Sequence, residues 1–169
     1  MTSPEIVEFG RNYAPFIHAG GVIVSVFAAG VWMFFQVRAN RRIAREKSTL
    51  DVLLKREWDK DYLDHKAKFN RLRDAEGGLS KWVCSDHKNS DEVNSIRYIF
   101  NDYELIALSI HRGIIDEMIY KEWFRSSMLR DYMAAEVAIR ATRTLANAPK
   151  NYIQWEELAK KWQREKAGT

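Results

Sequence analysis

A run of 22 residues that contains no Asp, Glu, Lys or Arg, from Ala14 to Phe35, limits most strongly what this chain can fold into. A helix needs about 20 mainly apolar residues to cross roughly 30 Å of bilayer hydrocarbon. Pro15 fits the first turn of such a helix, because a missing N–H costs nothing there. The run therefore predicts one transmembrane helix over residues 14–37, preceded by a short extracytoplasmic segment over residues 1–13.

A basic juxtamembrane segment, residues 38–47, follows the apolar run and sets its expected orientation. This segment holds five cationic side chains, whereas the net charge of the whole chain is only +4. Cationic residues gather on the cytoplasmic side of a span and are attracted to anionic lipid headgroups. We therefore expect the N-terminus outside and a helical domain over residues 48–169 in the cytoplasm. The side chains expected at the headgroups are Arg38, Arg41, Arg42, Arg45 and Lys47.

Charge and cysteine content argue against other classes of protein. A cleavable signal peptide is disfavoured because the region before the run is acidic, the run is longer than a signal core, and the cationic residues follow it. The positive charge is concentrated beside the membrane, so no nucleic-acid partner is expected. The single cysteine, Cys84, rules out an intrachain disulfide and is compatible with a reducing compartment.

Small residues recur every four positions within the span, at Gly21, Ser25 and Ala29. Such a stripe lets two membrane helices approach closely, so it predicts self-association of the span. The alternative is that Gly and Ala are simply common in membrane helices. His18 lies three residues before Gly21, and it either acts within the membrane or reaches the headgroups, so its role stays open.

Apolar residues after the basic segment recur at steps of three or four, and no segment shows sustained period-two alternation. This pattern predicts an all-α domain of about five helices, without strands. The first apolar series continues on both sides of Asp59. Either the membrane helix continues past this position, or a second helix begins there with Asp59 as its cap. The series consists of Leu50, Leu54, Trp58, Tyr62, His65, Phe69 and Leu72.

Turn and capping residues predict the remaining helix boundaries. These boundaries are a loop over residues 77–89, an N-cap at Ser90 or Asp91, a stop at Gly113, an N-cap at Asp116 and a break over residues 147–149. The region after Asp116 is expected to form one helix or a kinked pair. The apolar positions of these helices are Ile96, Phe100, Tyr103, Ala107 and Ile110, then Ile119 and Trp123, then Leu129, Met133, Val137, Ala141 and Leu145, and finally Trp155, Leu158, Ala159 and Trp162.

Two pairs of residues with metal-ligand side chains occur, but neither pair makes a site by itself. Cys84 and His87 supply at most half of the four ligands that a structural zinc ion needs. Asp61 and His65 lie one helical turn apart and would need two further ligands from elsewhere. A polar loop and a solvated helix face explain both pairs, so no metal or cofactor is expected.

Glu104 and His111 are seven residues apart, so they share one face of a helix. A carboxylate and an imidazole beside an apolar face can act as acid and base. They can equally form a buried polar pair that fixes how the helices meet, because charged groups that enter a core are normally paired. We favour the structural role. The chain has no phosphate-binding glycine loop, zinc-protease motif or serine elbow.

Three short motifs stand in a fixed order, at residues 103–107, 113–117 and 123–125. Together with later positions they resemble a bacterial and phage family described only as domain of unknown function number 4760, over roughly residues 48–165. The resemblance implies a helical domain that often follows a single membrane span, and hence the bacterial inner membrane, but it implies no catalytic residues. The later positions are Arg130, Ala135, Ile139, Arg143, Asn147, Tyr152, Trp155, Leu158 and Trp162.

The leading hypothesis is a membrane-anchored protein whose helical domain binds another protein, either a different chain or a second copy. Two alternatives are kept: a membrane-tethered enzyme that uses Glu104 and His111, and a phage- or defence-related effector that acts on the membrane through association of its span. We do not expect an enzyme. The residues predicted for the interaction surface are Glu104, His111, Arg112, Glu117 and Arg125.

Overall fold

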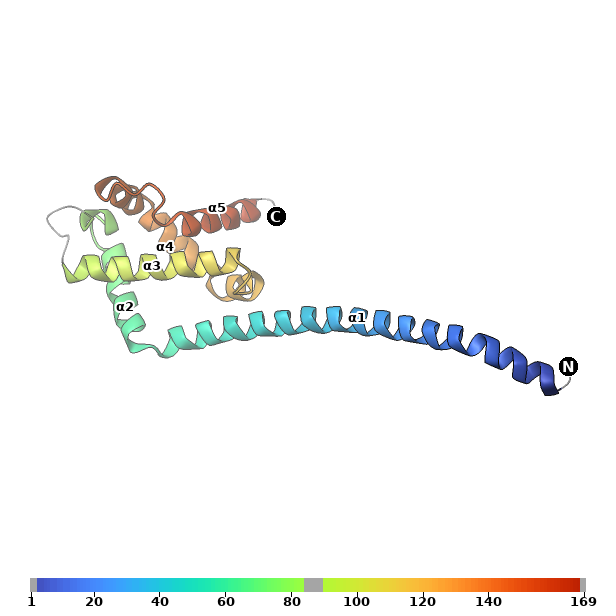
Figure 1. Ribbon diagram of the computed structural model, residues 1–169. Coiled ribbons are helices and arrows are strands. Elements are labelled where there is room, and N and C mark those ends of the chain that lie inside the picture. Colours follow the sequence, from blue (N-terminus) through green and yellow to red (C-terminus); the bar gives the residue numbers. More distant parts are fainter. Residues whose placement is uncertain (1–2, 84–89, 168–169) are drawn as a thin grey trace. The chain divides into compact units, whose positions relative to one another are not determined.

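The computed structural model describes residues 3–83 and 90–167, and the side chains of residues 20–83 and 90–165. This part of the chain consists of helices joined by short turns and contains no strand, which confirms the predicted all-α class (Figure 1). His18, Cys84 and His87 lie outside the residues whose side chains are described. The elements are α1 (Ser3–Trp58), α2 (Lys60–Asp74), the 3-10 helix η1 (Leu79–Lys81), α3 (Asp91–His111), α4 (Glu117–Leu145) and α5 (Ile153–Ala167).

The chain divides into two units, Met1–Ala44 and Arg45–Thr169. The first unit contains the apolar part of α1. From Gly20 onward this helix is long and apolar enough to cross a membrane, with a mean hydropathy of 1.8 over its most apolar stretch, and none of that stretch is buried. The predicted apolar N-terminal helix is therefore confirmed.

A capping residue separates α1 from α2. α1 ends at Trp58, and Asp59 has the extended backbone, φ −76° and ψ 106°, that is typical of an N-cap. Its carboxylate accepts hydrogen bonds from the backbone N–H groups of Asp61 and Tyr62, at 3.0 and 3.3 Å. Both alternatives drawn from the sequence hold, because the long helix continues to this point and a second helix begins at the predicted cap.

Four other predicted boundaries are confirmed as well, whereas residues 84–89 of the predicted loop lie outside the described residues. Ser90 caps α3 and Asp116 caps α4, each by accepting backbone N–H groups of the first turn. Gly113 follows the end of α3 with φ +67°, a left-handed conformation that glycine adopts without strain. α4 is one continuous helix, and Asn147, with φ +48°, lies just past its end. Within the described part of the predicted loop, η1 carries the buried side chain of Leu79.

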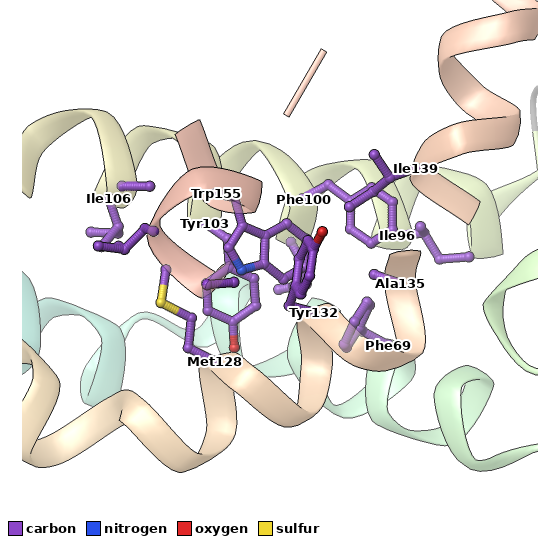
Figure 2. Packing of buried hydrophobic residues seen from close by; sticks show 14 of the residues in the cluster. Phe69, Ile96, Phe100, Tyr103, Ile106, Met128, Tyr132, Ala135, Ile139 and Trp155 are labelled. Atoms are coloured by element: carbon purple, nitrogen blue, oxygen red, sulfur yellow. The ribbon is translucent and has the colours of Figure 1, made fainter. Parts of the chain in front are cut away.

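The core of the second unit is an aromatic cluster around Trp155 of α5 (Figure 2). Trp155 stacks on Tyr103, with ring centroids 4.6 Å apart, and meets Phe100 and Tyr132 edge-on at 5.4 and 5.7 Å. Offset and edge-to-face contacts of this kind add to the stabilisation that burial of each ring provides. All predicted apolar positions of α5 are fully buried: Trp155, Leu158, Ala159 and Trp162.

The predicted apolar face near the end of α1 is not the buried one. Leu50, Leu54 and Trp58 are 50%, 53% and 82% exposed. Residues spaced four apart drift by about 40° per step around a helix of 3.6 residues per turn, so such a row leaves the face that packs. The side chains that are buried instead are Thr49, Leu53 and Arg56.

The same correction applies to α4. Met133, Val137 and Leu145 are exposed although they continue a four-residue repeat. The side chains that α4 buries alternate between steps of three and four, which keeps them on one side of the helix. These side chains include Met128, Tyr132, Ala135 and Ile139.

Candidate functional site

Glu104 and His111, the pair considered for catalysis, each contact the start of α5. Glu104 of α3 accepts hydrogen bonds from the backbone N–H groups of Gln154 and Trp155, at 3.1 and 2.9 Å. His111 Nδ1 lies 2.7 Å from Gln154 Oε1. A carboxylate at a helix N-terminus satisfies open N–H groups and interacts favourably with the helix dipole. Each of the two residues therefore links α3 to α5, although His111 is exposed and the two do not form the buried pair expected from the sequence.

Glu117 and Arg125 make similar contacts between α4 and the other end of α5. Glu117 accepts hydrogen bonds from Lys161 Nζ at 2.6 and 2.7 Å and from Trp162 Nε1 at 2.9 Å. Partial burial opposes its charge, but these hydrogen bonds outweigh burial and lower the pKa of Glu117. Arg125 donates to the backbone carbonyl of Trp162 at 2.7 Å. Arg112, the fifth predicted residue, is exposed at the C-cap of α3.

A buried charged cluster, which no sequence pattern indicated, joins α2, α3 and α4. Asp131 of α4 is fully buried and accepts hydrogen bonds from Lys66 and Arg73 of α2 and, at 2.7 Å, from the Tyr103 hydroxyl of α3. Lys66 also donates to the Tyr103 hydroxyl at 2.8 Å. A buried carboxylate is tolerated only with such partners, so this cluster ties the three helices together.

Burial and charge shift the pKa values of the cluster's members, and burial lowers the pKa of Lys66. Burial disfavours charge on Asp131, but the Lys66 ammonium and the hydrogen bonds to the carboxylate outweigh burial and lower the pKa of Asp131. Burial raises the pKa of Tyr103 well above its ordinary value, and the charge of Asp131 adds to this effect. At neutral pH Asp131 is ionised and Tyr103 is protonated, so neither is poised for proton transfer.

Arg56 of α1 is surrounded by four aromatic rings, which we call the Arg56 box. The residue is 5% exposed, and its guanidinium carbon lies 5.1 to 5.6 Å from the four ring centroids. It also donates hydrogen bonds to Asp102 and to the Tyr120 hydroxyl. Cation–π contacts within about 6 Å are attractive, and more so where water is excluded. The rings of the box belong to Tyr62, Tyr103, Tyr120 and Phe124.

The charge of Arg56 is retained inside the box. Burial disfavours the charged guanidinium, but the neighbouring tyrosines outweigh burial, and the pKa of Arg56 lies above its ordinary value. Burial raises the pKa of Tyr120 to about 12, although Arg56 works against this. The box therefore holds a permanent cation against neutral hydroxyls and the Asp102 carboxylate.

Arg45 of the basic segment contacts the residue that caps α4. Arg45 Nε lies 3.1 Å from the Asp116 carboxylate, and Thr49 Oγ1 accepts the backbone N–H of Asp116 at 2.7 Å. Arg45 and Asp116 line a shallow cleft of about 400 Å³, which holds as many acidic as cationic side chains and so favours no ligand of either charge. Its other lining residues are Glu117, Met118, Lys121, Lys161 and Glu165.

Within residues 3–83 and 90–167, no group of three or more His, Cys, Asp or Glu side chains is arranged to hold a metal ion. Asp61 is exposed at the start of α2. His65 Nδ1 lies 3.0 Å from Ser95 Oγ, and the His65 ring stacks on Tyr98 with centroids 4.3 Å apart. His65 therefore packs against α3.

The model of one protein family, Domain of unknown function (DUF4760), matches residues 15–162. The chain belongs to the DUF4760 family. The match begins before residue 48, where the sequence motifs placed the start of the likeness, so the DUF4760 region includes most of the apolar run as well as the helical domain. No match was found among curated proteins or among solved structures. Membership of DUF4760 thus places the architecture in a family without assigning an activity.

Proposed function

We propose that this DUF4760 protein is anchored in the bacterial inner membrane by a single crossing of α1 and binds another protein through its cytoplasmic helical domain. The exposed apolar helix carries the proposal, since Phe27, Trp32 and Phe34 are 75%, 72% and 63% exposed. Apolar surface in water costs about 25 cal/mol per Å², so a run of such side chains favours a bilayer around it.

The basic segment supports the cytoplasmic placement of the domain. Arg38, Arg41 and Arg42 follow the apolar run directly, and cationic residues at this position are typical of the cytoplasmic end of a span. They would also attract anionic headgroups, as would Lys47. Arg45 contributes less to lipid binding in this proposal, because it pairs with Asp116.

The hydrogen bonds of the candidate acid–base pair favour a binding function over catalysis. The enzyme alternative depends on Glu104 and His111, and both side chains are engaged in hydrogen bonds with residues of α5. In contrast, α4 exposes large apolar side chains, with Met118, Trp123 and Met133 at 79%, 72% and 64% exposure. Methionine and tryptophan are enriched at protein interfaces. We propose the exposed side of α4 as the contact surface, with the predicted interaction residues supporting it through α5.

Self-association through the small residues of the span stays a prediction. Ser25 Oγ donates to the backbone carbonyl of Gly21 at 2.8 Å, which satisfies the hydroxyl within its own helix. No side chain would need to be displaced for a second helix to approach Gly21, because space there is open. The effector alternative has no support beyond this stripe.

Affinity recovery of the full-length chain from native membranes tests the binding function. Replacing both Trp123→Ala and Met133→Ser is expected to abolish recovery of the partner while circular dichroism stays unchanged. Arg140→Ala is the matched control, because Arg140 lies on the same helix in an exposed pair with Glu136, 3.4 Å apart. Equal recovery by the double variant and the control would contradict the proposed surface.

A further inference from the structure

The part of α1 that belongs to the second unit, from Arg45 to Trp58, packs along an unusually polar seam. Its buried side chains are those of Thr49, Leu53 and Arg56, and only one of these is apolar. The Thr49 hydroxyl accepts the backbone N–H of Asp116, the residue that caps α4. The guanidinium of Arg56 lies among the aromatic rings described above. Leu53 and the partly buried Val52 supply the apolar contacts of this segment with the core, and Arg56 adds cation–π contacts and hydrogen bonds.

All components of the Arg56 box lie outside α1. One ring comes from α2, one from α3 and two from α4, and Asp102 lies on α3. Arg56 is thus an inserted group, comparable to a ligand that occupies a pocket of the body formed by α2, α3, α4 and α5.

Contacts within the body hold the box in shape without Arg56. Tyr103 donates to Asp131 at 2.7 Å and stacks on Trp155, and Tyr120 stacks on Phe124 with ring centroids 5.1 Å apart. The rings are therefore positioned by the same core that buries α5. A preformed site of this kind loses little entropy when it binds its ligand.

The chemistry of the box suits a guanidinium group. A planar, weakly hydrated cation stacks on rings and directs its N–H groups in fixed directions, whereas an ammonium is a compact and strongly hydrated charge. Arg56 uses different nitrogens for the Tyr120 hydroxyl and the Asp102 carboxylate. Its Nε has no hydrogen-bond partner among the described residues.

We propose that the Arg56 box and Asp102 form a guanidinium-binding site of the α2–α5 body, which Arg56 fills in cis and which thereby latches the end of α1 to the body. This inference goes beyond the proposed function and does not depend on whether α1 crosses a membrane.

Chemical complementation of the full-length chain in mild detergent tests the latch. In a Cys84→Ser background, spin labels at Leu54→Cys on α1 and Met133→Cys on α4, both at exposed positions, report the distance between the two helices. We expect a narrow distance distribution with Arg56 present and loss of that distribution in Arg56→Ala and Arg56→Lys. Ethylguanidinium is expected to restore it in Arg56→Ala, and ethylammonium is not.

Control measurements distinguish loss of the latch from unfolding and from the mere removal of a cation. Arg140→Ala removes an exposed cation of α4 and is expected to leave the distribution narrow. Circular dichroism and tryptophan fluorescence of Arg56→Ala are expected to stay native, because the body holds the box. A narrow distribution in Arg56→Ala or Arg56→Lys, equal rescue by the two cations, or unfolding of the body in Arg56→Ala would each overturn the proposal.

Discussion

The carboxylate of Glu104 on α3 accepts the backbone N–H of Trp155 on α5 at 2.9 Å, so a side chain of one helix caps the start of another. The same carboxylate also accepts the N–H of Gln154. The cap lies beside the Trp155 ring, which is the centre of the aromatic core. Loss of the cap is therefore expected to disturb the packing of the Trp155 ring, and loss of that packing to disturb the cap.

Glu104→Ala is expected to lower the free energy of unfolding by about 1–2 kcal/mol, the usual cost of a lost helix cap. Glu104→Gln keeps one acceptor and is expected to lose less. Urea denaturation of the full chain in micelles, followed by tryptophan fluorescence, measures both. Glu136→Ala is the control, because Glu136 forms an exposed pair with Arg140. Equal effects at the two positions would contradict the capping role.

Asp131→Asn is expected to lower the free energy of unfolding by about 3 kcal/mol, because it leaves Lys66 and Arg73 without their buried counter-charge. Asp74→Asn provides the comparison, since Asp74 also pairs with Arg73, at 2.8 Å, but is exposed. Thermal unfolding of the two variants under identical conditions gives the difference. If both variants melt like the parent, the buried cluster does not stabilise the domain.

Stability is expected to fall in acid partly because of Asp131. Its pKa is lowered in the folded state, so the unfolded chain binds the proton first as pH falls. The stabilisation is therefore complete above the unfolded pKa of about 3.9 and is lost as pH falls through the folded value. Melting temperatures measured from pH 6 downward are expected to drop more steeply for the parent than for Asp131→Asn. Parallel curves would contradict this assignment.

Reversing charge beside the apolar run is expected to disturb its orientation. Arg38→Glu, Arg41→Glu and Arg42→Glu together remove the cationic excess that favours the cytoplasmic side. Arg45 is kept, because it pairs with Asp116. A reporter fused to the C-terminus is expected to be cytoplasmic in the parent and partly misplaced in the triple variant. A parent reporter found outside the cell would contradict the orientation.

Local signals in the sequence predicted the boundaries of the fold well. Asp59, Ser90 and Asp116 each cap a helix at the predicted position, because a capping side chain bonds to backbone groups only two or three residues away. The buried face of α5 was also predicted, since its apolar residues alternate between steps of three and four. Rows of apolar residues spaced strictly four apart, such as the one that ends at Leu145, predicted buried positions that the structure leaves largely exposed.

The charged interior could not be predicted in the same way. The partners of Arg56 and Asp131 lie 46 and 65 positions away in the chain, at Asp102 and Lys66, so no local pattern marks either residue as buried. One signal was available, because Lys66 shares a helical face with the aromatic residues of α2. A cation in an aromatic stripe predicts a buried partner, but the sequence does not say which carboxylate supplies it.

The most direct measurement of the central claim is alkaline carbonate extraction of membranes from cells that express the full-length chain. An integral membrane protein stays in the pellet after this treatment, because hydrocarbon rather than charge holds it. We expect the chain in the pellet, and in the supernatant only after detergent is added. Release of the intact chain by carbonate alone would contradict a bilayer-spanning α1.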